Sequence, residues 1–452
     1  MIKKTLKEIQ QMVGGTGLEQ RFEDLTVTGV TIDSRTVVAG NLYIPIIGAR
    51  VDGHEFVKNV VSTAVATLWQ QDIPNMPTDI PVITVANTTA ALQQLAVAYK
   101  NDLAMKVVGI TGSNGKTSTK DILASILATK YKVHKTPGNF NSEFGMPLTL
   151  LMAPSDTQIA VLEMGMRGLG QIQLLSELAK PDVAMITCIG EAHIEELGSR
   201  ENISIAKYEI TAGLSEAGLF VYHGDEPLLD DRIAEAKPDF NLISFGKRVV
   251  NDYYPTSIEV VDNGMTFAIN QSELEFHLSV LGKHNVMNAI SAIAVARHFN
   301  IDFSDIKQGL TNVEMSKMRM DVTHSKNNMM IINDAYNSSP TSVRATLDLL
   351  YTLTGYDKKI VVLGDMLELG DSEISYHQEI GAAIDVSQID AVLTFGPLAK
   401  HICDCSLVPN SQHFTDKIAL AEYLDSISDA KTVCLVKGSR GMALEEVIAQ
   451  IS

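Results

Sequence analysis

Short apolar runs alternate with amphipathic stretches along most of the chain, and this alternation predicts strands separated by helices. Strands are predicted at residues 107–110, 159–162 and 183–187, and helices at about 117–128 and 170–179. Buried β-branched runs joined by helices are typical of a mostly parallel sheet that is covered on both faces. The pattern therefore predicts an α/β fold.

The same alternation begins again after a change of pattern near residues 312–322. An Ala-rich stretch at 284–299 predicts one helix, and the runs that follow it predict strands at 329–332, 360–363, 391–395 and 432–436. Before residue 102, short strands such as 81–85 mix with helical patterns such as 89–99. We predict three α/β domains, a number that fits 452 residues at about 150 per domain. Their ranges are 1–102, 103–316 with a parallel sheet, and 317–452 with a Rossmann-like sheet.

Composition narrows the classes of function. The 36 basic and 54 acidic residues give a net charge of −18, which argues against a general nucleic-acid or anionic-membrane binder. A local basic pocket for a phosphorylated small molecule stays compatible with this charge. The four cysteines form no C-x-x-C pair and so indicate neither a zinc module nor a disulfide framework; they are Cys188, Cys403, Cys405 and Cys434.

The apolar segments indicate neither a signal peptide nor a membrane span. Residues 1–15 predict an amphipathic helix, since no unbroken apolar stretch follows the two lysines. The apolar run at 289–296 is too short to cross a bilayer. We expect a reduced, soluble, cytoplasmic protein.

The most informative stretch is a glycine-rich turn between the strand at 107–110 and the helix that begins near Thr117. Glycines let backbone N–H groups face a phosphate, and the helix N-terminus adds a favourable dipole. A lysine and a threonine then supply a charge for the phosphates and a hydroxyl for Mg²⁺. The strict G-x-x-x-x-G-K-[ST] motif fails, because Ile110 replaces its first glycine. The nucleotide-binding candidates are Gly112, Ser113, Asn114, Gly115, Lys116, Thr117 and Ser118.

Polar residues follow two other predicted strands, at the edge where open parallel sheets bind ligands. Glu163 closes the strand at 159–162, where its carboxylate could reach a Mg²⁺ held by Thr117. His193 follows the strand at 183–187 and is a candidate for a second metal or a phosphate, although a loop histidine is more often a surface residue. Lys207 lies on a predicted helix and gains no role from its pattern.

Together these motifs resemble the Mur ligases, the ATP-dependent amide-forming enzymes of peptidoglycan precursor synthesis. The turn T-G-S-N-G-K-T at 111–117 is similar to the family's own form of the phosphate loop. The resemblance implies that the site holds two magnesium ions and that Glu163 and His193 are among their ligands. It also implies that Lys207 carries a carbamate. It places Asn288, in G-K-H-N-V-M-N-A at 282–289, at adenine, whereas its neighbour Asn285 is a candidate helix N-cap.

The resemblance also assigns residues of the last domain and of the substrate sites. It implies that Arg319 reaches the ATP phosphates and that Asp334 lies near the nucleotide, at an interface that domain closure seals. The segments 138–147, 363–370 and 436–441 are similar to those of the member that adds D-alanyl-D-alanine to UDP-N-acetylmuramoyl-tripeptide. The substrate candidates are Ser34, Arg35, Asn139, Asn141 and Asp365, the last with Glu368 as a site for the dipeptide amine.

The implied reaction activates a carboxylate as an acyl phosphate, which the dipeptide amine then attacks. Lys116, His193, Lys207 and Arg319 are the implied catalytic residues, acting in a monomer without a nucleic-acid or membrane partner. Adding lysine or diaminopimelate one step earlier is the nearest alternative, although the D-N-P-R motif of the diaminopimelate-specific form is absent. On spacing, D-S-R at 33–35 is typical of a capped turn. A P-loop motor ATPase and a non-catalytic nucleotide-binding scaffold are the other classes considered.

Overall fold

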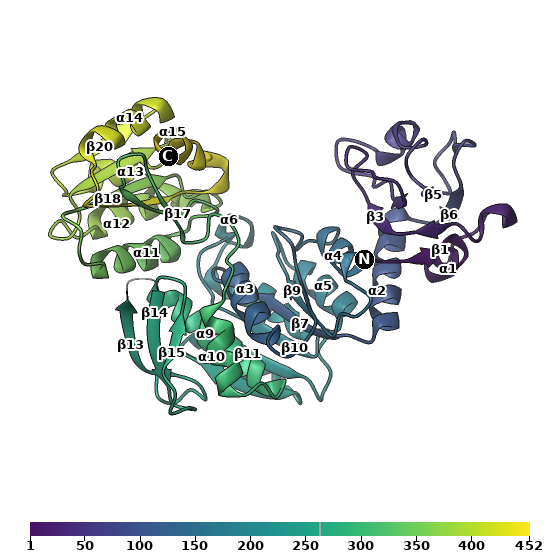
Figure 1. Cartoon of the computed structure of the whole chain (residues 1–452), viewed down its shortest axis with the longest axis horizontal. Helices are drawn as coiled ribbons and strands as arrows, with labels where there is room; N and C mark the ends of the chain where they lie inside the picture. Colours follow the sequence, from purple (N-terminus) through teal and green to yellow (C-terminus); the bar gives the residue numbers. More distant parts are fainter. Residues whose placement is uncertain (262–263) are drawn as a thin grey trace.

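The computed structural model describes residues 1–261 and 264–452 and arranges them in three lobes (Figure 1). The N-terminal lobe (residues 1–103) and the C-terminal lobe (321–452) flank the central lobe (106–311). The mixed α/β architecture agrees with the predicted fold class. The domain boundaries predicted near residues 102 and 316 stay predictions. At the first of them, the helix α2 (Thr88–Leu103) packs against the central lobe.

The N-terminal lobe has a four-stranded parallel sheet in the order β3-β4-β5-β6. The chain starts with strand β1 (Lys4–Thr5), and the helix α1 (Leu6–Met12) is shorter than the one predicted for 1–15. The helix begins at Leu6 because Thr5 and Glu8 form a capping box. The other strands are β2 (Thr26–Val27), β3 (Gly29–Thr31), β4 (Asn41–Tyr43), β5 (Ala66–Gln70) and β6 (Val82–Val85).

The central lobe has a six-stranded parallel sheet in the order β12-β11-β10-β7-β9-β8. Its strands are β7 (Lys106–Thr111), β8 (Val133–Lys135), β9 (Ile159–Glu163), β10 (Val183–Ile186), β11 (Leu219–His223) and β12 (Asn241–Phe245). Its helices include α3 (Lys116–Leu127), α4 (Gly145–Met152), α5 (Gln171–Ala179), α6 (Ile194–Leu197), α7 (Arg200–Tyr208), α8 (Pro227–Ala236), α9 (Lys283–His298) and α10 (Phe303–Thr311). Thr111 and Glu163 therefore end neighbouring strands at one edge of the sheet.

Two features of the central lobe differ from the sequence prediction. A three-stranded antiparallel sheet, which the pattern did not predict, consists of β13 (Pro255–Val261), β14 (Gly264–Ile269) and β15 (Phe276–Leu278). Asn285 is not the N-cap of α9, which is Gly282. Asn285 lies inside the first turn of the helix, where its side chain donates a 2.8 Å hydrogen bond to the Leu281 carbonyl.

The C-terminal lobe has a second six-stranded sheet in the order β16-β17-β21-β18-β19-β20, in which β16 is the antiparallel edge strand. Its strands are β16 (Asp321–His324), β17 (Met330–Asp334), β18 (Lys358–Gly364), β19 (Ala391–Phe395), β20 (Ser411–Phe414) and β21 (Thr432–Lys437). Its helices are α11 (Pro340–Thr352), α12 (Glu373–Ala383), α13 (Lys400–Cys405), α14 (Lys417–Ile427) and α15 (Glu445–Ile451). This lobe has the predicted helix-covered α/β sheet.

The hydrophobic core continues from the central sheet into both neighbours. Alternate residues of β7 point to opposite faces. Val108 packs into a cluster that reaches Leu350 and Val361 of the C-terminal lobe. Val107 belongs to a second cluster, which extends to Leu92 on α2 and to the N-terminal sheet. The lobes are thus joined by apolar packing as well as by the chain.

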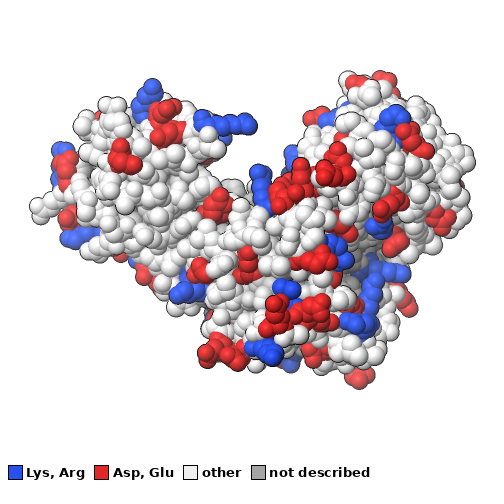
Figure 2. Space-filling view, turned by 180° about the vertical axis from the view of Figure 1, so that it is seen from behind, with Lys and Arg blue, Asp and Glu red and all other residues white. Residues whose placement is uncertain are grey.

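The surface between the outer lobes is hollowed. Figure 2 shows a notch that opens between them, with acidic and basic side chains interspersed over the visible face. Among the helices in residues 1–261 and 264–452, none is long and apolar enough to cross a membrane.

Candidate active site

The phosphate loop connects β7 to α3, as predicted. Gly115 has φ 83°, and a Cβ at this position would lie 2.6 Å from the side-chain oxygen of Asn288. A Cβ on Gly112 would lie 1.8 Å from the Thr187 hydroxyl oxygen. These positions need glycine because the loop turns sharply and packs closely against Thr187, which follows β10, and against Asn288 on α9. The loop thereby places Asn288 directly beside its last residue.

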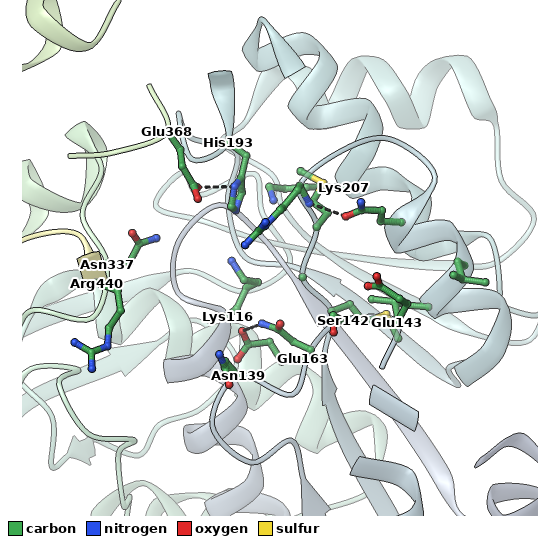
Figure 3. Close-up of a pocket in the computed structure, with 18 of the residues that line it drawn as sticks. Lys116, Asn139, Ser142, Glu143, Glu163, His193, Lys207, Asn337, Glu368 and Arg440 are labelled. Carbon is green, nitrogen blue, oxygen red and sulfur yellow. Dashed lines mark hydrogen bonds and ion pairs between the residues drawn. The ribbon is translucent and has the colours of Figure 1, made fainter. Parts of the chain in front are cut away.

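Lys116 begins α3 and points into a cavity of about 760 Å³ between the central and C-terminal lobes (Figure 3). Its ammonium donates a 2.6 Å hydrogen bond to the Gly112 carbonyl. Burial lowers the pKa of Lys116, and the nearby Glu163 carboxylate opposes that effect. The Lys116 side chain therefore lies at the loop that would hold the phosphates.

Three polar groups meet at the carboxyl edge of the central sheet. The Thr117 hydroxyl donates a 2.8 Å hydrogen bond to Glu163, whose second carboxylate oxygen accepts a 2.8 Å bond from Asn141. Arg319 approaches from the start of the C-terminal part of the chain and donates to the Thr117 hydroxyl at 3.2 Å. The structure therefore brings together residues that the sequence separates by up to 202 positions.

Lys207 lies on α7 and lines the same cavity, although its side chain is almost completely buried. Burial holds the pKa of Lys207 well below its ordinary value, and the positive charge of Lys116 adds to this effect. The Lys207 amine therefore loses its proton more readily than an exposed lysine does.

His193 precedes α6 and lies across the cavity from Glu163 (Figure 3). Its Nδ1 is 2.8 Å from a carboxylate oxygen of Glu368, which belongs to the loop after β18. The contact with His193 is the main cause of a lowered pKa at Glu368. With Glu196, these two residues place three potential metal-ligand atoms within 4.8 Å of one another.

The C-terminal lobe contributes one wall of the cavity. The Arg319 guanidinium lies 4.2 Å from the ring centre of Tyr336, so the ring holds it in place by a cation–π contact. Figure 3 shows Asn337 and Arg440 on the wall that faces Lys116. Asp334 ends β17 and is 2.5 Å from the buried ammonium of Lys437.

Most of the predicted site residues lie at or beside this cavity. Those that line it are Lys116, Asn139, Asn141, Glu163, His193, Lys207, Arg319 and Glu368. Sequence reasoning gave no role to Arg167, Tyr336, Asn337 and Arg440, which also line it. Tyr336 and Asn337 lie two and three residues after Asp334, and Arg440 lies within the segment 436–441, so the motifs of the family resemblance mark the region of all three.

Three predicted substrate residues lie elsewhere. Arg35 is exposed in the N-terminal lobe, where its backbone N–H and guanidinium donate to the Asp33 carboxylate in a capped turn that includes Ser34. Asp365 is 2 % exposed and accepts a 2.7 Å bond from the Ala399 N–H. Its carboxylate organises the loop before α13 and does not face the cavity, so the geometry does not support its predicted contact with the dipeptide amine.

Comparison with known proteins identifies the family. Family models match residues 26–100 ("Mur ligase family, catalytic domain"), 110–296 ("Mur ligase middle domain") and 318–440 ("Mur ligase, glutamate ligase domain"). A Bacillus subtilis relative is 45% identical over 100% of this chain and 99% of its own length. The chain belongs to the Mur ligase family. The membership predicted from the motifs is thus confirmed.

Individual relatives and solved structures within the family are also similar to this Mur ligase. The Bacillus subtilis relative is named UDP-N-acetylmuramoyl-tripeptide–D-alanyl-D-alanine ligase. A crystal structure of MurF from Acinetobacter baumannii has a TM-score of 0.90 and 29% identity, covering 100% of this chain and 99% of that one. MurF from Thermotoga maritima in complex with ADP has a TM-score of 0.84 and 29% identity, covering 94% and 96%. The three-lobe fold is therefore that of solved Mur ligases.

Proposed function

We propose that this Mur ligase uses ATP to join D-alanyl-D-alanine to UDP-N-acetylmuramoyl-tripeptide, giving the pentapeptide precursor of peptidoglycan. The observation that carries the proposal is the 45% identity, over the whole chain, to a relative named for that reaction. The cavity supports it, because a phosphate loop and its lysine face a wall supplied by another lobe. Such a site can hold ATP and two further reactants together.

The reaction proceeds in two substitutions. The terminal carboxylate of the tripeptide attacks the γ-phosphorus of ATP, forming an acyl phosphate and releasing ADP. The neutral amine of the dipeptide then attacks the acyl carbon, losing a proton as the amide forms and phosphate leaves. Lys116 and Arg319 stabilise negative charge on the transferring phosphoryl group. The cavity walls orient the reactants and keep water from the acyl phosphate.

The donor set fits magnesium. Thr117 and Glu163 offer a hydroxyl and a carboxylate 2.8 Å apart, and His193 offers a ring nitrogen across the cavity. We infer that these residues hold two Mg²⁺ ions, which when bound supply charge neutralisation at the phosphates. Lys207 would contribute as a carbamate, because its neutral amine can add to CO₂ with loss of one proton. Carbamylation converts a nitrogen base into an oxygen-bearing anion suited to Mg²⁺.

The remaining substrate contacts are assigned by position. Asn139 and Asn141 line the cavity and would contact the sugar-peptide part of the nucleotide. Ser34 and Arg35 would bind the uridine diphosphate end from the N-terminal lobe. Asn288 would contact adenine, and Asp334 would act near the nucleotide through Lys437. We further propose a cytoplasmic monomer, since both substrates are soluble and the cavity is built within one chain.

The decisive experiment measures phosphate release from ATP and Mg²⁺ with UDP-N-acetylmuramoyl-tripeptide, with and without D-alanyl-D-alanine. Release that needs both substrates, with a product heavier by the dipeptide residue, is the expected result. Release with the UDP-muramoyl-dipeptide and lysine or diaminopimelate would assign the preceding step instead. Turnover that ignores every muramoyl nucleotide would refute the proposal.

A further inference from the structure

The contact between His193 and Glu368 joins two lobes at the cavity. His193 belongs to the loop between β10 and α6 of the central lobe, whereas Glu368 follows β18 in the C-terminal lobe. Their side chains approach to 2.8 Å, as the dashed line in Figure 3 shows. The 175 positions between them mean that the contact depends on how the lobes dock.

Both residues have unusual backbones. His193 has φ 67° and Glu368 has φ 64°, in the left-handed region that non-glycine residues rarely adopt. A left-handed residue costs about 1–2 kcal/mol, and such strain concentrates at functional sites. The two loops therefore accept strain that directs one side chain toward the other.

The chemistry of the pair fits metal support. A histidine that binds a metal through one ring nitrogen usually donates its other N–H to a carboxylate, which fixes its tautomer and orientation. Here Glu368 faces Nδ1, which leaves Nε2 as the second ring nitrogen. We propose that Glu368 is the positioning residue for His193, so that docking of the C-terminal lobe completes the support of a metal site in the central lobe. This inference rests on the proposed metal role of His193.

Truncation of Glu368 would remove the carboxylate without removing the docking contact. The backbone carbonyl of Glu368 accepts a 3.3 Å hydrogen bond from the Glu195 N–H, and this bond does not involve the side chain. A matched control is available in the same interface. The Thr341 hydroxyl donates to Glu191 at 2.7 Å, also between the lobes, and does not touch His193.

The test titrates the full chain, saturated with ADP, with Mn²⁺ and follows free Mn²⁺ by electron paramagnetic resonance. Glu368→Ala should weaken the Mn²⁺ site that depends on His193 by about 10–100-fold, the usual effect of removing a supporting carboxylate. Glu368→Gln should lose less, because its amide oxygen can still lie beside Nδ1. Thr341→Val should bind Mn²⁺ as the wild type does. Thermal unfolding of each variant checks that it is folded.

Each outcome decides one point. Wild-type affinity in Glu368→Ala overturns the inference. An equal loss in Thr341→Val would mean that docking in general is responsible, and an equal loss in Glu368→Gln would make Glu368 a direct ligand; both overturn the positioning role. His193→Ala serves as the reference variant. If it binds Mn²⁺ normally, the proposed metal role of His193 fails, whereas ligase activity of the wild type is tested separately by phosphate release.

Discussion

A glycine of the phosphate loop, Gly115, can be compared with Gly170, which has the same backbone conformation at the start of another helix. Gly115 is the N-cap of α3 with φ 83° and ψ −10°, and Gly170 is the N-cap of α5 with φ 81° and ψ −15°. A Cβ on Gly170 would meet nothing within 4 Å, whereas one on Gly115 would lie 2.6 Å from the Asn288 oxygen. Alanine at the two positions therefore separates backbone strain from steric conflict.

The magnitudes follow from these contacts. Either substitution places alanine in a left-handed conformation, at about 1–2 kcal/mol. Gly115→Ala also displaces Asn288, whose side chain donates a 3.0 Å hydrogen bond to Asn285. Losing that buried bond adds about 1 kcal/mol. For a unit of about 150–250 residues, 1 kcal/mol shifts the melting temperature by roughly 2–4 °C. We expect Gly170→Ala to melt about 2–8 °C below wild type and Gly115→Ala a further 2–4 °C lower.

The assay is a thermal scan combined with ADP titration by calorimetry. Melting temperatures are compared between variants, because a chain of several domains has no single two-state free energy of unfolding. Gly115→Ala should weaken ADP about tenfold or more, since one hydrogen bond to a charged group contributes about 1.5–3 kcal/mol. Gly170 also lines the cavity, but a Cβ there would meet no atom within 4 Å, so Gly170→Ala should bind ADP as wild type does. Equal melting and equal ADP affinity in the two variants would refute the assigned role of the loop.

Three other predictions concern single side chains. Lys207→Ala should lose most of its turnover and regain part of it with short carboxylic acids; full activity without them would exclude a carbamate of consequence. Asp365→Ala should lower the melting temperature, because the Ala399 N–H loses its acceptor at about 1–3 kcal/mol. A selective rise in KM for the dipeptide without that change would contradict this structural role. Arg319→Lys should reduce kcat at least tenfold with little change in melting, since lysine cannot reproduce the planar contact with Tyr336.

Elements that depend on a local pattern of residues could be predicted from the sequence. The strand, loop and helix around Lys116 follow from a β-branched run, a glycine-rich turn and a helical pattern that are contiguous in the chain. Glu163 was assigned because it ends a buried strand, and neighbouring parallel strands end at one edge. The prediction that Arg319 belongs to the same site depends on the family resemblance alone.

Contacts between distant loops were not predictable in this way. The role of Asp365 depends on where the loop before α13 folds back, and the partner of Glu368 depends on how two lobes dock. The antiparallel sheet was missed because β13 is largely exposed or half-buried and has no continuous apolar run. Short strands with this pattern resemble loops in sequence.

The continuity of the core between lobes bears on how the protein can be divided in the laboratory. The apolar side of α2 is covered by the central lobe, and its buried residues include Leu92, Leu95 and Tyr99. A fragment that ended at residue 102 would expose this side to water, and the rest of the chain would expose its complement. Such surfaces favour aggregation. Soluble fragments should therefore keep the first two lobes together, even though their sheets are separate.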